Sequence, residues 1–593
     1  MTTIADVALP IEERWGIKRC RYATEGASAG RVCIATGTHG DEMMGQLIVY
    51  RIEQRIAANP NALNGVVDFY PMLNPLGLDI AHRMVPSATR LDMNRAFPGS
   101  PDGTPLEYLC WQIIQDMSGA DLVLDIHASA RNKSELYEVR VSAKEADRLL
   151  PRVRALCPQL IWVYPDKGSF SASLTGALGA AGVDAAILEA EGYRNCPESA
   201  AWHLVPGGKY YTTRNGSAIL AWRMPKGPLT GWHAAASHSD SPTWRIKTLD
   251  GADHGFARAE VEGYGGMLMS TWFDRPLSVA GRLLVRTADG VESRLVHPER
   301  ALACIPNLCI HFNREANTGL NYNPQVDLQP IFGAEGGSLK DTLAAEAGGK
   351  AEDILATDLV LCITEKAQRV GLQGEYFMSG RIDDLECAYA TLYGFLQGRG
   401  EEAGRGDIWV MFDNEEVGSS SRQGAQGTLM ADVLARIEES LGVTKEQSIR
   451  ARTNCLLLSA DNGHAIHPNH PEKSDQKLPV NMGGGVILKY NARQTYTTSG
   501  LTGAAFTAIC EKAGVPVQTF ANRADVAGGS TLGNLLGRQI LMPMVDIGVG
   551  QLAMHSAMET ASCKDAEYLA NACAAYYNTP IFQPKDGEWK LGL

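Results

Sequence analysis

The sequence predicts an α/β protein of several domains, built on mostly parallel sheets. Short apolar runs rich in β-branched residues alternate with stretches of helical periodicity, which is typical of strands connected by helices. The chain has 593 residues, and at roughly 100–200 residues per domain that length requires more than one core. A stretch of period-two alternation after residue 243 interrupts this pattern and predicts an inserted all-β segment.

The first third of the chain predicts one α/β domain, which we place at residues 1–197. Its expected strands are apolar runs at 31–37, 66–73, 120–128 and 184–192. Around residues 192–217 the sequence becomes polar and rich in turn residues, which indicates the main domain boundary.

A second α/β domain is predicted at residues 198–242 and 365–593, in two parts that flank a β-rich insertion at 243–364. Expected strands of the insertion lie at 281–287 and 292–297, and a Gly/Ala-rich stretch at 333–355 predicts short helices. The α/β signals resume near Asp358, with apolar runs at 358–363, 407–412, 455–461 and 542–548.

Composition excludes several classes of partner. The formal net charge is -13, whereas a nucleic-acid-binding surface is basic. No apolar run approaches the ~20 residues that a membrane-spanning helix needs, and residues 1–16 lack the basic and apolar regions of a secretory signal. The 13 cysteines are scattered, without a C-x-x-C pair. We therefore expect a cytoplasmic protein with reduced thiols and with neither a nucleic-acid nor a membrane partner.

Acidic residues and histidines recur beside strand ends and Gly/Ser/Pro turns in the C-terminal two-thirds of the chain. Each fragment alone is weak evidence, because a lone histidine is more often a core residue and a Glu-Glu pair usually lies on a solvated face. Together they form a hard N/O ligand set suited to Zn²⁺ and open to Mn²⁺ or Co²⁺. The candidates are His238, Asp240, Asp383, Glu415, Glu416, Asp461 and His555, with His464 and His467 behind Asp461.

"FDNEEVGS", residues 412–419, is the most unusual of these fragments, because its two glutamates follow a buried strand. Neighbouring carboxylates repel each other, and removing them from water is costly. Bound cations would offset that cost. Successive side chains at a strand end diverge, so the sequence predicts that Glu415 and Glu416 face different partners.

Residues 202–580 closely resemble the aspartyl aminopeptidase/aminopeptidase I family of zinc metallopeptidases. The motifs that carry the resemblance occur in family order: "GGKYYTTRNGSAILAW", "SHSDSP", "STWFDRPLSVAGRLLV", "IPNLCIHFNRE", "SGRIDD", "FDNEEVGS", "SADNGHAIHPNHPEK", "GGVILKYN", "FANRADVAGGSTLGN" and "VDIGVGQLAMHSAMET". The resemblance implies an enzyme that removes N-terminal residues from peptides with a pair of zinc ions.

The same resemblance assigns a role to each candidate. Asp383 would bridge the two ions, His238 and Asp461 would complete one site, and Glu416 and His555 would complete the other. Glu415 would be the general base toward a bridging water. Asp240 would orient His238, as metal-bound histidines usually require.

The resemblance also extends to assembly and substrate binding. The insertion at 243–364 is similar to the family's dimerisation domain, and the family forms tetrahedral shells of twelve subunits, which implies a homo-oligomer. His311 matches a histidine that reaches toward a neighbouring subunit's active site. Lys489 matches a pocket lysine that could meet an acidic substrate side chain; alternatively, it is a surface lysine after a strand.

A second constellation lies near the N-terminus, where His39 and Glu42 follow one predicted strand and His127 ends another. Two histidines and one glutamate with an open fourth position form a catalytic zinc set. Residues 28–195 resemble the succinylglutamate desuccinylase/aspartoacylase branch of the zinc carboxypeptidase superfamily, on "TGTHGDEMMGQ", "NPLGLDIAHRMVPSATRLDMNRAFPG", "DIHAS" and "GVDAAILEAEG".

This second resemblance implies one zinc ion on His39, Glu42 and His127. Asn94 and Arg95 would grip a substrate carboxylate, which an arginine can bind through two hydrogen bonds. Arg83 would polarise the substrate carbonyl, with Arg90 as the alternative. The general base would be Glu189, with Glu191 as the alternative.

Both resemblances are incomplete where they meet, near residues 193–201. The C-terminal domain of the desuccinylase/aspartoacylase family and the initial helices and strand of the aminopeptidase family are missing there. The leading hypothesis is a zinc aminopeptidase that carries a truncated deacylase-like domain. The alternatives are an N-acyl amino acid amidohydrolase whose C-terminal part supplies assembly, and an oligomeric shell protein with relict sites. The complete C-terminal ligand set argues against the last, because unneutralised buried acids destabilise a fold.

Overall fold

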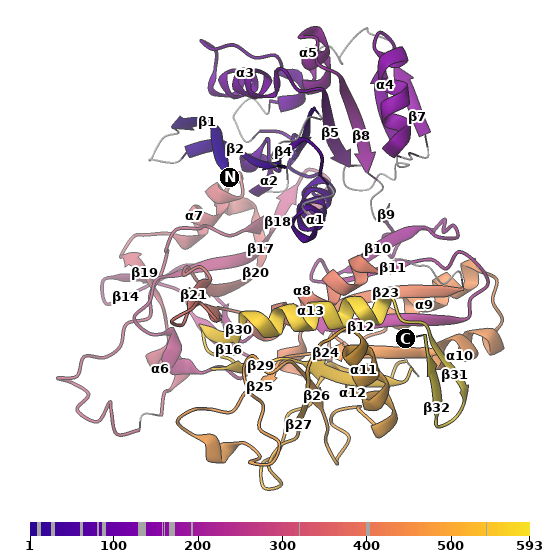
Figure 1. Ribbon diagram of the computed structural model, residues 1–593. Coiled ribbons are helices and arrows are strands. Elements are labelled where there is room, and N and C mark those ends of the chain that lie inside the picture. The colour runs from indigo at the N-terminus through magenta and orange to yellow at the C-terminus, as the bar shows by residue number, and fades with distance from the viewer. Residues whose placement is uncertain are drawn as a thin grey trace. The chain divides into compact units, whose positions relative to one another are not determined.

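The computed structural model divides the chain into two compact units, Met1–Asn195 and Cys196–Leu593. It describes residues 1–592 except 9–13, 25–29, 60–62, 80–81, 86–90, 129–137, 157, 159, 165–171, 191–193, 320, 399–403 and 541. Each unit carries its own sheet and core, coloured along the chain in Figure 1. None of the helices within these described ranges has the length and apolar character to cross a membrane.

The N-terminal unit is built on one eight-stranded sheet with the order β1-β2-β4-β3-β5-β8-β6-β7. Its middle strands β4, β3, β5 and β8 run parallel, whereas β1 and β2 form an antiparallel edge. The strands are β1 (Thr2–Ala8), β2 (Arg14–Ala23), β3 (Arg31–Thr36), β4 (Val66–Tyr70), β5 (Leu122–Ala128), β6 (Glu138–Ser142), β7 (Leu160–Tyr164) and β8 (Ala185–Ala190).

Helices cover both faces of this sheet. Residues of α3 and α5 belong to one hydrophobic cluster, and residues of α1 and α4 belong to another. Helix α3 begins at a capping box, in which Thr104 and Glu107 satisfy each other's backbone N–H groups. The helices are α1 (Met44–Ala58), α2 (Pro75–Asp79), α3 (Pro105–Met117), α4 (Ala146–Val153) and α5 (Leu174–Ala180).

The C-terminal unit has a central sheet with the order β27-β26-β28-β24-β12-β23-β11-β10. Strands β28, β24, β12 and β23 run parallel, so their carboxyl ends lie along one edge. The strands are β10 (Lys209–Arg214), β11 (Ala218–Arg223), β12 (Gly231–His238), β23 (Arg405–Phe412), β24 (Cys455–Ala460), β26 (Val486–Lys489), β27 (Val517–Phe520) and β28 (Met544–Gly548).

Helices pack on this sheet as well. Helix α9 contributes to the large core cluster with β12 and β23. Helices α8 and α13 lie side by side (Figure 1), and Tyr576 and Tyr577 of α13 donate hydrogen bonds to carbonyls of the central strands. The helices are α8 (Ile382–Gln397), α9 (Leu429–Ser440), α10 (Lys445–Thr453), α11 (Gly500–Lys512), α12 (Leu532–Leu536) and α13 (Cys563–Tyr577).

Two small sheets complete this part of the unit. One has the order β21-β22-β30-β29-β25, and the other is the hairpin of β31 and β32. Their strands are β21 (Gln368–Val370), β22 (Tyr376–Ser379), β25 (Gly463–His464), β29 (Gly550–Leu552), β30 (Glu559–Ser562), β31 (Ile581–Lys585) and β32 (Glu588–Leu591).

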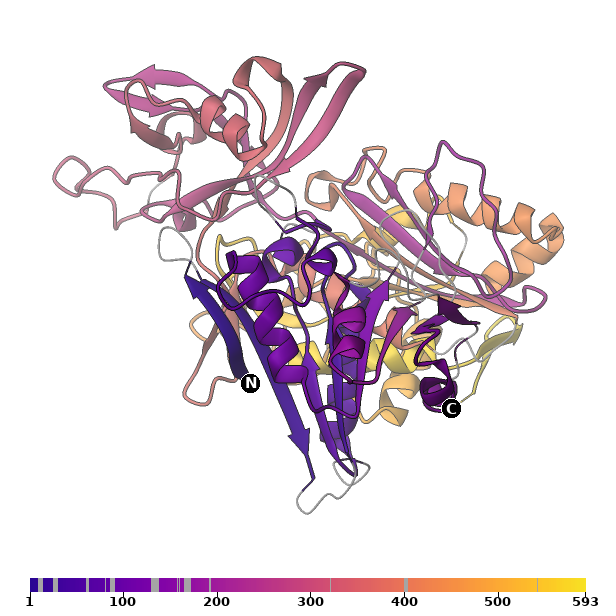
Figure 2. The ribbon, with the colours of Figure 1, turned by 90° about the horizontal axis from the view of Figure 1, so that it is seen from above.

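The segment from residue 243 to residue 363 forms a separate lobe of antiparallel sheets with two short helices, drawn in magenta to salmon in Figure 2. Its sheets have the orders β16-β13-β20-β17-β18 and β14-β15-β19. The elements are β13 (Thr243–Ile246), β14 (Gly251–Asp253), β15 (Phe256–Arg258), β16 (Val261–Tyr264), β17 (Leu277–Thr287), β18 (Gly290–Val296), β19 (Ile331–Ala334), β20 (Ile354–Ile363), α6 (Pro324–Asp327) and α7 (Leu339–Glu346).

The predicted α/β class with mostly parallel central sheets is confirmed, and the predicted strands are present with shifted ends. The apolar run at 66–73, for example, is extended only over Val66–Tyr70. The run at 358–363, expected to resume the α/β pattern, instead belongs to β20 of the antiparallel lobe. Glu415 and Glu416 follow a buried strand, as predicted, but they lie in a turn rather than at the strand end itself. Strand β23 ends at Phe412, Asn414 adopts the left-handed conformation with φ 62°, and Glu415–Val417 form a 3₁₀ turn.

Candidate metal centre

The C-terminal candidates converge at one end of the central sheet. His238 ends β12, and Asp461 directly follows β24. Ligand sites of open α/β sheets collect at the carboxyl ends of such strands. Asp383 enters from the start of α8, and His555 from the turn after β29. Potential ligand atoms lie within 4.8 Å of one another in three overlapping groups: His238, Asp383, Asp384 and Asp461; His238, Glu415 and Glu416; and Asp383, Glu416 and His555.

The carboxylate of Asp383 lies between two histidines. Its Oδ1 is 3.5 Å from Nε2 of His238, and its Oδ2 is 3.5 Å from Nε2 of His555. Nε2 of His238 is also 4.0 Å from Asp461 Oδ1, and Nε2 of His555 is 3.4 Å from Glu416 Oε1. A carboxylate that bridges two cations needs this arrangement, with one oxygen toward each half of the site.

The residues present fit divalent cations. Oδ1 of Asp383 and Oδ1 of Asp384 are buried without a hydrogen-bond partner among the residues that the structure describes. An unpaired buried carboxylate oxygen is costly, and a metal ion would satisfy it. Histidine nitrogens with carboxylate oxygens form the hard N/O donor set that zinc accepts.

Burial shifts the pKa values of Glu415 and Asp461 upward. Burial raises the pKa of Glu415 to about 8, and the charges of Asp461 and Glu416 add to this effect. Burial likewise raises the pKa of Asp461 to about 6, against the opposing charge of Lys489. A carboxyl group with a pKa near 8 can both take up and release a proton at neutral pH.

Asp240 contacts His238, which it was predicted to orient, and also the backbone of the two glutamates. Nδ1 of His238 is 3.1 Å from the backbone carbonyl of Asp240 and 3.5 Å from its Oδ1. The Asp240 carboxylate also accepts the backbone N–H groups of Glu415 at 3.0 Å and Glu416 at 3.1 Å. Asp240 therefore fixes the 3₁₀ turn that presents both glutamates.

Glu559 fixes the backbone of Asp383 and His555 in the same way as Asp240 fixes that of the glutamates. Sequence reasoning missed Glu559. Its carboxylate accepts the backbone N–H groups of Asp383 at 3.1 Å and His555 at 2.7 Å. Burial raises the pKa of Glu559 to about 7, with a further rise from the charge of Asp383. The available signal was its place in "HSAMET", four residues after His555.

Replacing Glu559 by glutamine is expected to lower zinc affinity roughly 10–100-fold, the usual cost of losing a group that orients metal ligands. A glutamine amide keeps one acceptor but turns an NH₂ donor toward one of the two backbone N–H groups. Competition with a chelator measures the change. The exposed Glu567 on the nearby helix α13 provides the control, since Glu567→Gln should retain zinc as the wild type does. Equal zinc affinity in the two variants would contradict the assignment.

Lys489 is buried at the end of β26, so the alternative that it is a surface residue is wrong. Its Nζ donates to the carbonyl of Asn462 at 2.7 Å and lies 3.6 Å from Asp461 Oδ2. His311 lies in an exposed stretch of the inserted segment and belongs to none of the ligand groups among the described residues. Substrate contacts of Lys489 and His311 stay predictions.

A cavity of about 290 Å³ is formed by the chain that follows Asp461 and by the chain that precedes His555. Its polar lining includes the side chains of His464, His467, Lys473, Asp475 and Arg523. Tyr496, Phe520 and Met554 provide apolar walls.

The N-terminal candidates His39, Glu42 and His127 also come together, and all three are buried. Oε1 of Glu42 is 2.8 Å from Nδ1 of His39, and its Oε2 is 2.9 Å from Nδ1 of His127. The opposite ring nitrogens face carboxylates, with His39 Nε2 at 3.2 Å from Asp92 and His127 Nε2 at 3.0 Å from Asp125. Carboxylates in this position commonly orient metal-binding histidines, and sequence reasoning missed both aspartates.

Arg83 is the predicted substrate residue that the structure brings to this cluster. Its Nη1 donates to Glu42 Oε1 at 3.0 Å. Burial opposes ionisation of Glu42, but the hydrogen bonds from His127 and His39 lower its pKa well below the ordinary value. Glu42 is therefore a carboxylate, the form in which it could bind a cation.

The other predicted residues of this site have separate contacts. Asn94 Oδ1 accepts the backbone N–H of Leu174 at 3.0 Å, and Arg95 Nη1 donates to the carbonyl of Asn94 at 2.7 Å. Glu189 is the register neighbour of His127 on β8, and its carboxylate pairs with Nη1 of Arg140 at 2.9 Å. The alternatives Arg90 and Glu191 lie outside the described residues.

Comparison with known proteins gives two family matches. Residues 182–577 match the family Aminopeptidase I zinc metalloprotease (M18), and residues 28–192 match the Succinylglutamate desuccinylase/Aspartoacylase catalytic domain. Both resemblances seen in the sequence are confirmed.

Individual relatives agree with the first match. The chain is 38% identical over 404 residues to the "Probable M18 family aminopeptidase 2" of Clostridium novyi (strain NT), covering 66% of this chain and 93% of the relative. A cryo-EM structure of a complex of Ape4 and Nbr1 matches with a TM-score of 0.62 and 32% identity, covering 65% of this chain and 79% of that one. The S. cerevesiae mApe1 dodecamer matches with a TM-score of 0.57 and 25% identity, covering 65% and 89%. The chain belongs to the aminopeptidase I family of zinc metalloproteases and is a zinc metalloaminopeptidase.

Proposed function

We propose that the C-terminal unit removes N-terminal residues from peptides with two zinc ions and Glu415 as the general base. One observation carries this proposal: the two oxygens of Asp383 are shared between His238 and His555, each of which also faces a further carboxylate. His238, Asp383 and Asp461 would hold one ion, and Asp383, Glu416 and His555 would hold the other. When bound, such a pair lowers the pKa of a water molecule and polarises the scissile carbonyl.

Glu415 is suited to carry the proton. It lies in a ligand group with His238 and Glu416, and two nearby cations would keep its carboxyl group ionised and able to accept a proton. Its carboxylate takes a proton from the attacking water and passes it to the leaving amine. The hydrogen bond from the Glu415 backbone N–H to Asp240 fixes the side chain's point of attachment during both transfers.

The substrate class is a peptide with a free N-terminus and an acidic first residue. The cavity of about 290 Å³ next to His464 supports this proposal, because Lys473 and Arg523 contribute cationic groups to its wall. Asp475 offsets part of that charge, and Arg523 is also paired with Asp525 at 2.7 Å. A screen of Asp-, Glu- and Leu-p-nitroanilides tests the preference; a higher kcat/KM for Leu than for Asp and Glu would contradict it.

Metal stoichiometry tests the two-ion site directly. Elemental analysis of the full chain should find two zinc ions in the C-terminal unit and one more when the N-terminal cluster is loaded. Mn²⁺ or Co²⁺ should replace zinc after chelation, because both accept the same donor set. One ion or none in the C-terminal unit would refute the proposal.

The protein is proposed to act as a homo-oligomer. The support comes from the structural relatives, one of which is described as a dodecamer. The inserted β-rich segment at 243–364 is the proposed dimerisation domain, and its exposed His311 is proposed to reach a neighbouring subunit's active site. Light scattering measures the mass, and a monomer at micromolar concentration would contradict this proposal.

The N-terminal cluster supports a second candidate function, the hydrolysis of N-acyl amino acids. The observation that favours it is the buried set of His39, Glu42 and His127, in which each histidine is held by a carboxylate. Arg83 is proposed to polarise the substrate carbonyl, Asn94 and Arg95 to bind the carboxylate, and Glu189 to serve as the base. The pairing of Glu189 with Arg140 must open for this last role.

Replacing His39 by alanine is expected to remove the N-terminal zinc ion and to leave aminopeptidase activity within about twofold of the wild type. The two ligand clusters belong to separate compact units, so loss of one should not alter the other. Hydrolysis of aminoacyl p-nitroanilides and of N-acyl amino acids is measured side by side. His82→Ala, at an exposed histidine of the same unit, provides the control. Loss of aminopeptidase activity in His39→Ala alone would contradict the two-site assignment.

A further inference from the structure

One corner of the inserted segment reaches the metal centre. We call residues 264–268, which begin at the last residue of β16, the 264–268 corner. The carbonyl of Gly266 accepts a hydrogen bond from Nδ1 of His555 at 2.7 Å, and the N–H of Leu268 donates to the carbonyl of His555 at 2.9 Å. These bonds place the proton of His555 on Nδ1 and direct its Nε2 toward Asp383 and Glu416.

Tyr264 connects the same corner to the loop of the general base. Its hydroxyl donates to Asp240 Oδ2 at 2.8 Å and accepts a hydrogen bond from Asn414 Nδ2 at 2.8 Å. Asp240 in turn accepts the backbone N–H groups of Glu415 and Glu416. One phenol therefore lies two hydrogen bonds away from both glutamates.

Gly265 lets the corner approach Glu416 closely. Its φ is +75°, and a Cβ at this position would lie 3.2 Å from Cβ of Glu416 and 3.3 Å from Pro242. A glycine adopts this backbone conformation without steric cost, whereas an L side chain does not. The close approach and the positive φ both favour glycine here.

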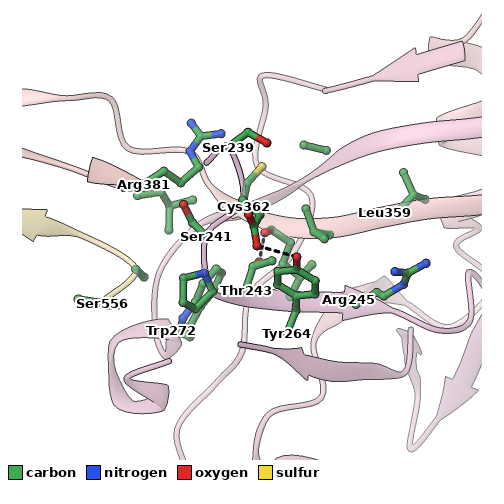
Figure 3. Close-up of a pocket in the computed structure, with 18 of the residues that line it drawn as sticks. Ser239, Ser241, Thr243, Arg245, Tyr264, Trp272, Leu359, Cys362, Arg381 and Ser556 are labelled. Atoms are coloured by element: carbon green, nitrogen blue, oxygen red, sulfur yellow. Dashed lines mark hydrogen bonds between the residues drawn. The ribbon is translucent and has the colours of Figure 1, made fainter. Parts of the chain in front are cut away.

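The corner borders a cavity of about 320 Å³ between the inserted segment and the chain around the metal centre (Figure 3). Tyr264 lies in the wall of this cavity, with its hydroxyl at the end of a dashed hydrogen bond. Asp240, Asn414 and Glu559 also line it. The hydrogen bonds described above support the corner on the side of this cavity, and Met267 packs against the hydrophobic core of the inserted segment.

We propose that the 264–268 corner positions the ligands of both proposed zinc sites, with Tyr264 as a positioning residue for Glu415 and Glu416 and Gly266 as the partner that orients His555. The inserted segment is then a component of the metal centre as well as a candidate dimerisation domain. Movements of this segment, including those imposed by a neighbouring subunit, should change zinc affinity. This inference rests on the proposed two-zinc function.

Tyr264→Phe removes only the hydroxyl and tests the link to Asp240. We expect zinc affinity, measured by chelator competition on the full chain, to fall roughly 10–100-fold. With zinc in excess, kcat should fall while KM changes by less than about twofold, because the base and a ligand are displaced but the substrate cavity is not. The absorption spectrum of the Co²⁺-loaded protein should shift. Tyr322→Phe, in the same segment with its ring against Phe273, is the control and should match the wild type.

Gly265→Ala tests the close approach to Glu416. We expect this variant to lose zinc affinity, with Gly263→Ala as the matched control. Gly263 lies two residues earlier, on β16, without a positive φ and with Met267 at 3.4 Å as the nearest residue to an added Cβ. If Gly265→Ala fails to fold, Tyr264→Phe still decides the matter.

The outcomes separate the two proposals. If the wild-type protein binds fewer than two zinc ions in its C-terminal unit, the proposed function fails. If the wild type binds two ions and Tyr264→Phe matches Tyr322→Phe in zinc affinity, kcat and Co²⁺ spectrum, the positioning role is overturned. A loss of thermal stability in Tyr264→Phe without a change in zinc affinity would overturn it as well.

Discussion

Glu415→Gln is expected to abolish peptide hydrolysis while both zinc ions remain bound. The amide has nearly the shape of the carboxyl group but cannot accept a proton from the attacking water. General-base catalysis contributes typically 10²–10⁴-fold, and the loss should lie in or above this range because the same group returns the proton to the leaving amine. The measurements are kcat with an aminoacyl p-nitroanilide and zinc content by elemental analysis.

The zinc content makes this result interpretable. A variant that lost metal as well as activity would show that Glu415 is a ligand rather than a base. Turnover at the wild-type rate would refute the mechanism outright. We expect two zinc ions in the variant, because Glu415 belongs to neither of the two proposed zinc sites. One consists of His238, Asp383 and Asp461, and the other of Asp383, Glu416 and His555.

Glu416→Ala is expected to leave one zinc ion in the C-terminal unit instead of two. Glu416 Oε1 lies 3.4 Å from Nε2 of His555, and both face Asp383. Removing the carboxylate leaves His555 and one oxygen of Asp383, too few protein ligands for a tightly bound zinc ion. Activity should fall with the metal, and added zinc should not restore it.

Val417→Ala is the matched control for this variant. Val417 ends the same 3₁₀ turn, and its side chain is exposed. Truncating it should change neither zinc content nor kcat. Two zinc ions in Glu416→Ala would show that another residue completes the second site.

The clustering of the proposed ligands could be predicted from the sequence because each of them lies in a motif next to a strand end or a turn. His238 and Asp461 follow from the strand pattern, since the parallel strands β12 and β24 are neighbours. His39, Glu42 and His127 follow in the same way from β3 and β5. The periodicity of apolar residues fixes which strands are buried, and parallel pairing then brings their ends together.

The orienting groups could not be predicted in the same way. Asp240 was predicted to orient His238, but its hold on Glu415, like that of Glu559 on Asp383, consists in accepting a backbone N–H group from far away in the sequence. Any backbone offers such donors, so no side-chain pattern identifies which carboxylate will accept them. Asp92 and Asp125 contact histidine rings and Tyr264 contacts Asp240, and these side-chain contacts form only once the tertiary fold brings the groups together.

The turn around Glu415 and the burial of Lys489 also could not be predicted from the sequence. The 3₁₀ turn depends on the left-handed conformation of Asn414, which asparagine tolerates but does not require. Lys489 is buried because Asn462 and Asp461 from a neighbouring loop meet its ammonium group. A lysine after an apolar run gives no sign of such partners.

The path of the chain through the central sheet has a consequence for folding kinetics. His233 on β12 and Asp407 on β23 are hydrogen-bonded at 2.9 Å although they are 174 positions apart. The chain between them contains the whole inserted segment, so pairing these strands requires the closure of a very long loop. Closure entropy grows with the logarithm of loop length, and a segment that has already folded shortens the effective loop. We therefore expect the antiparallel lobe to form before β12 meets β23, which makes completion of the metal centre a late event in folding.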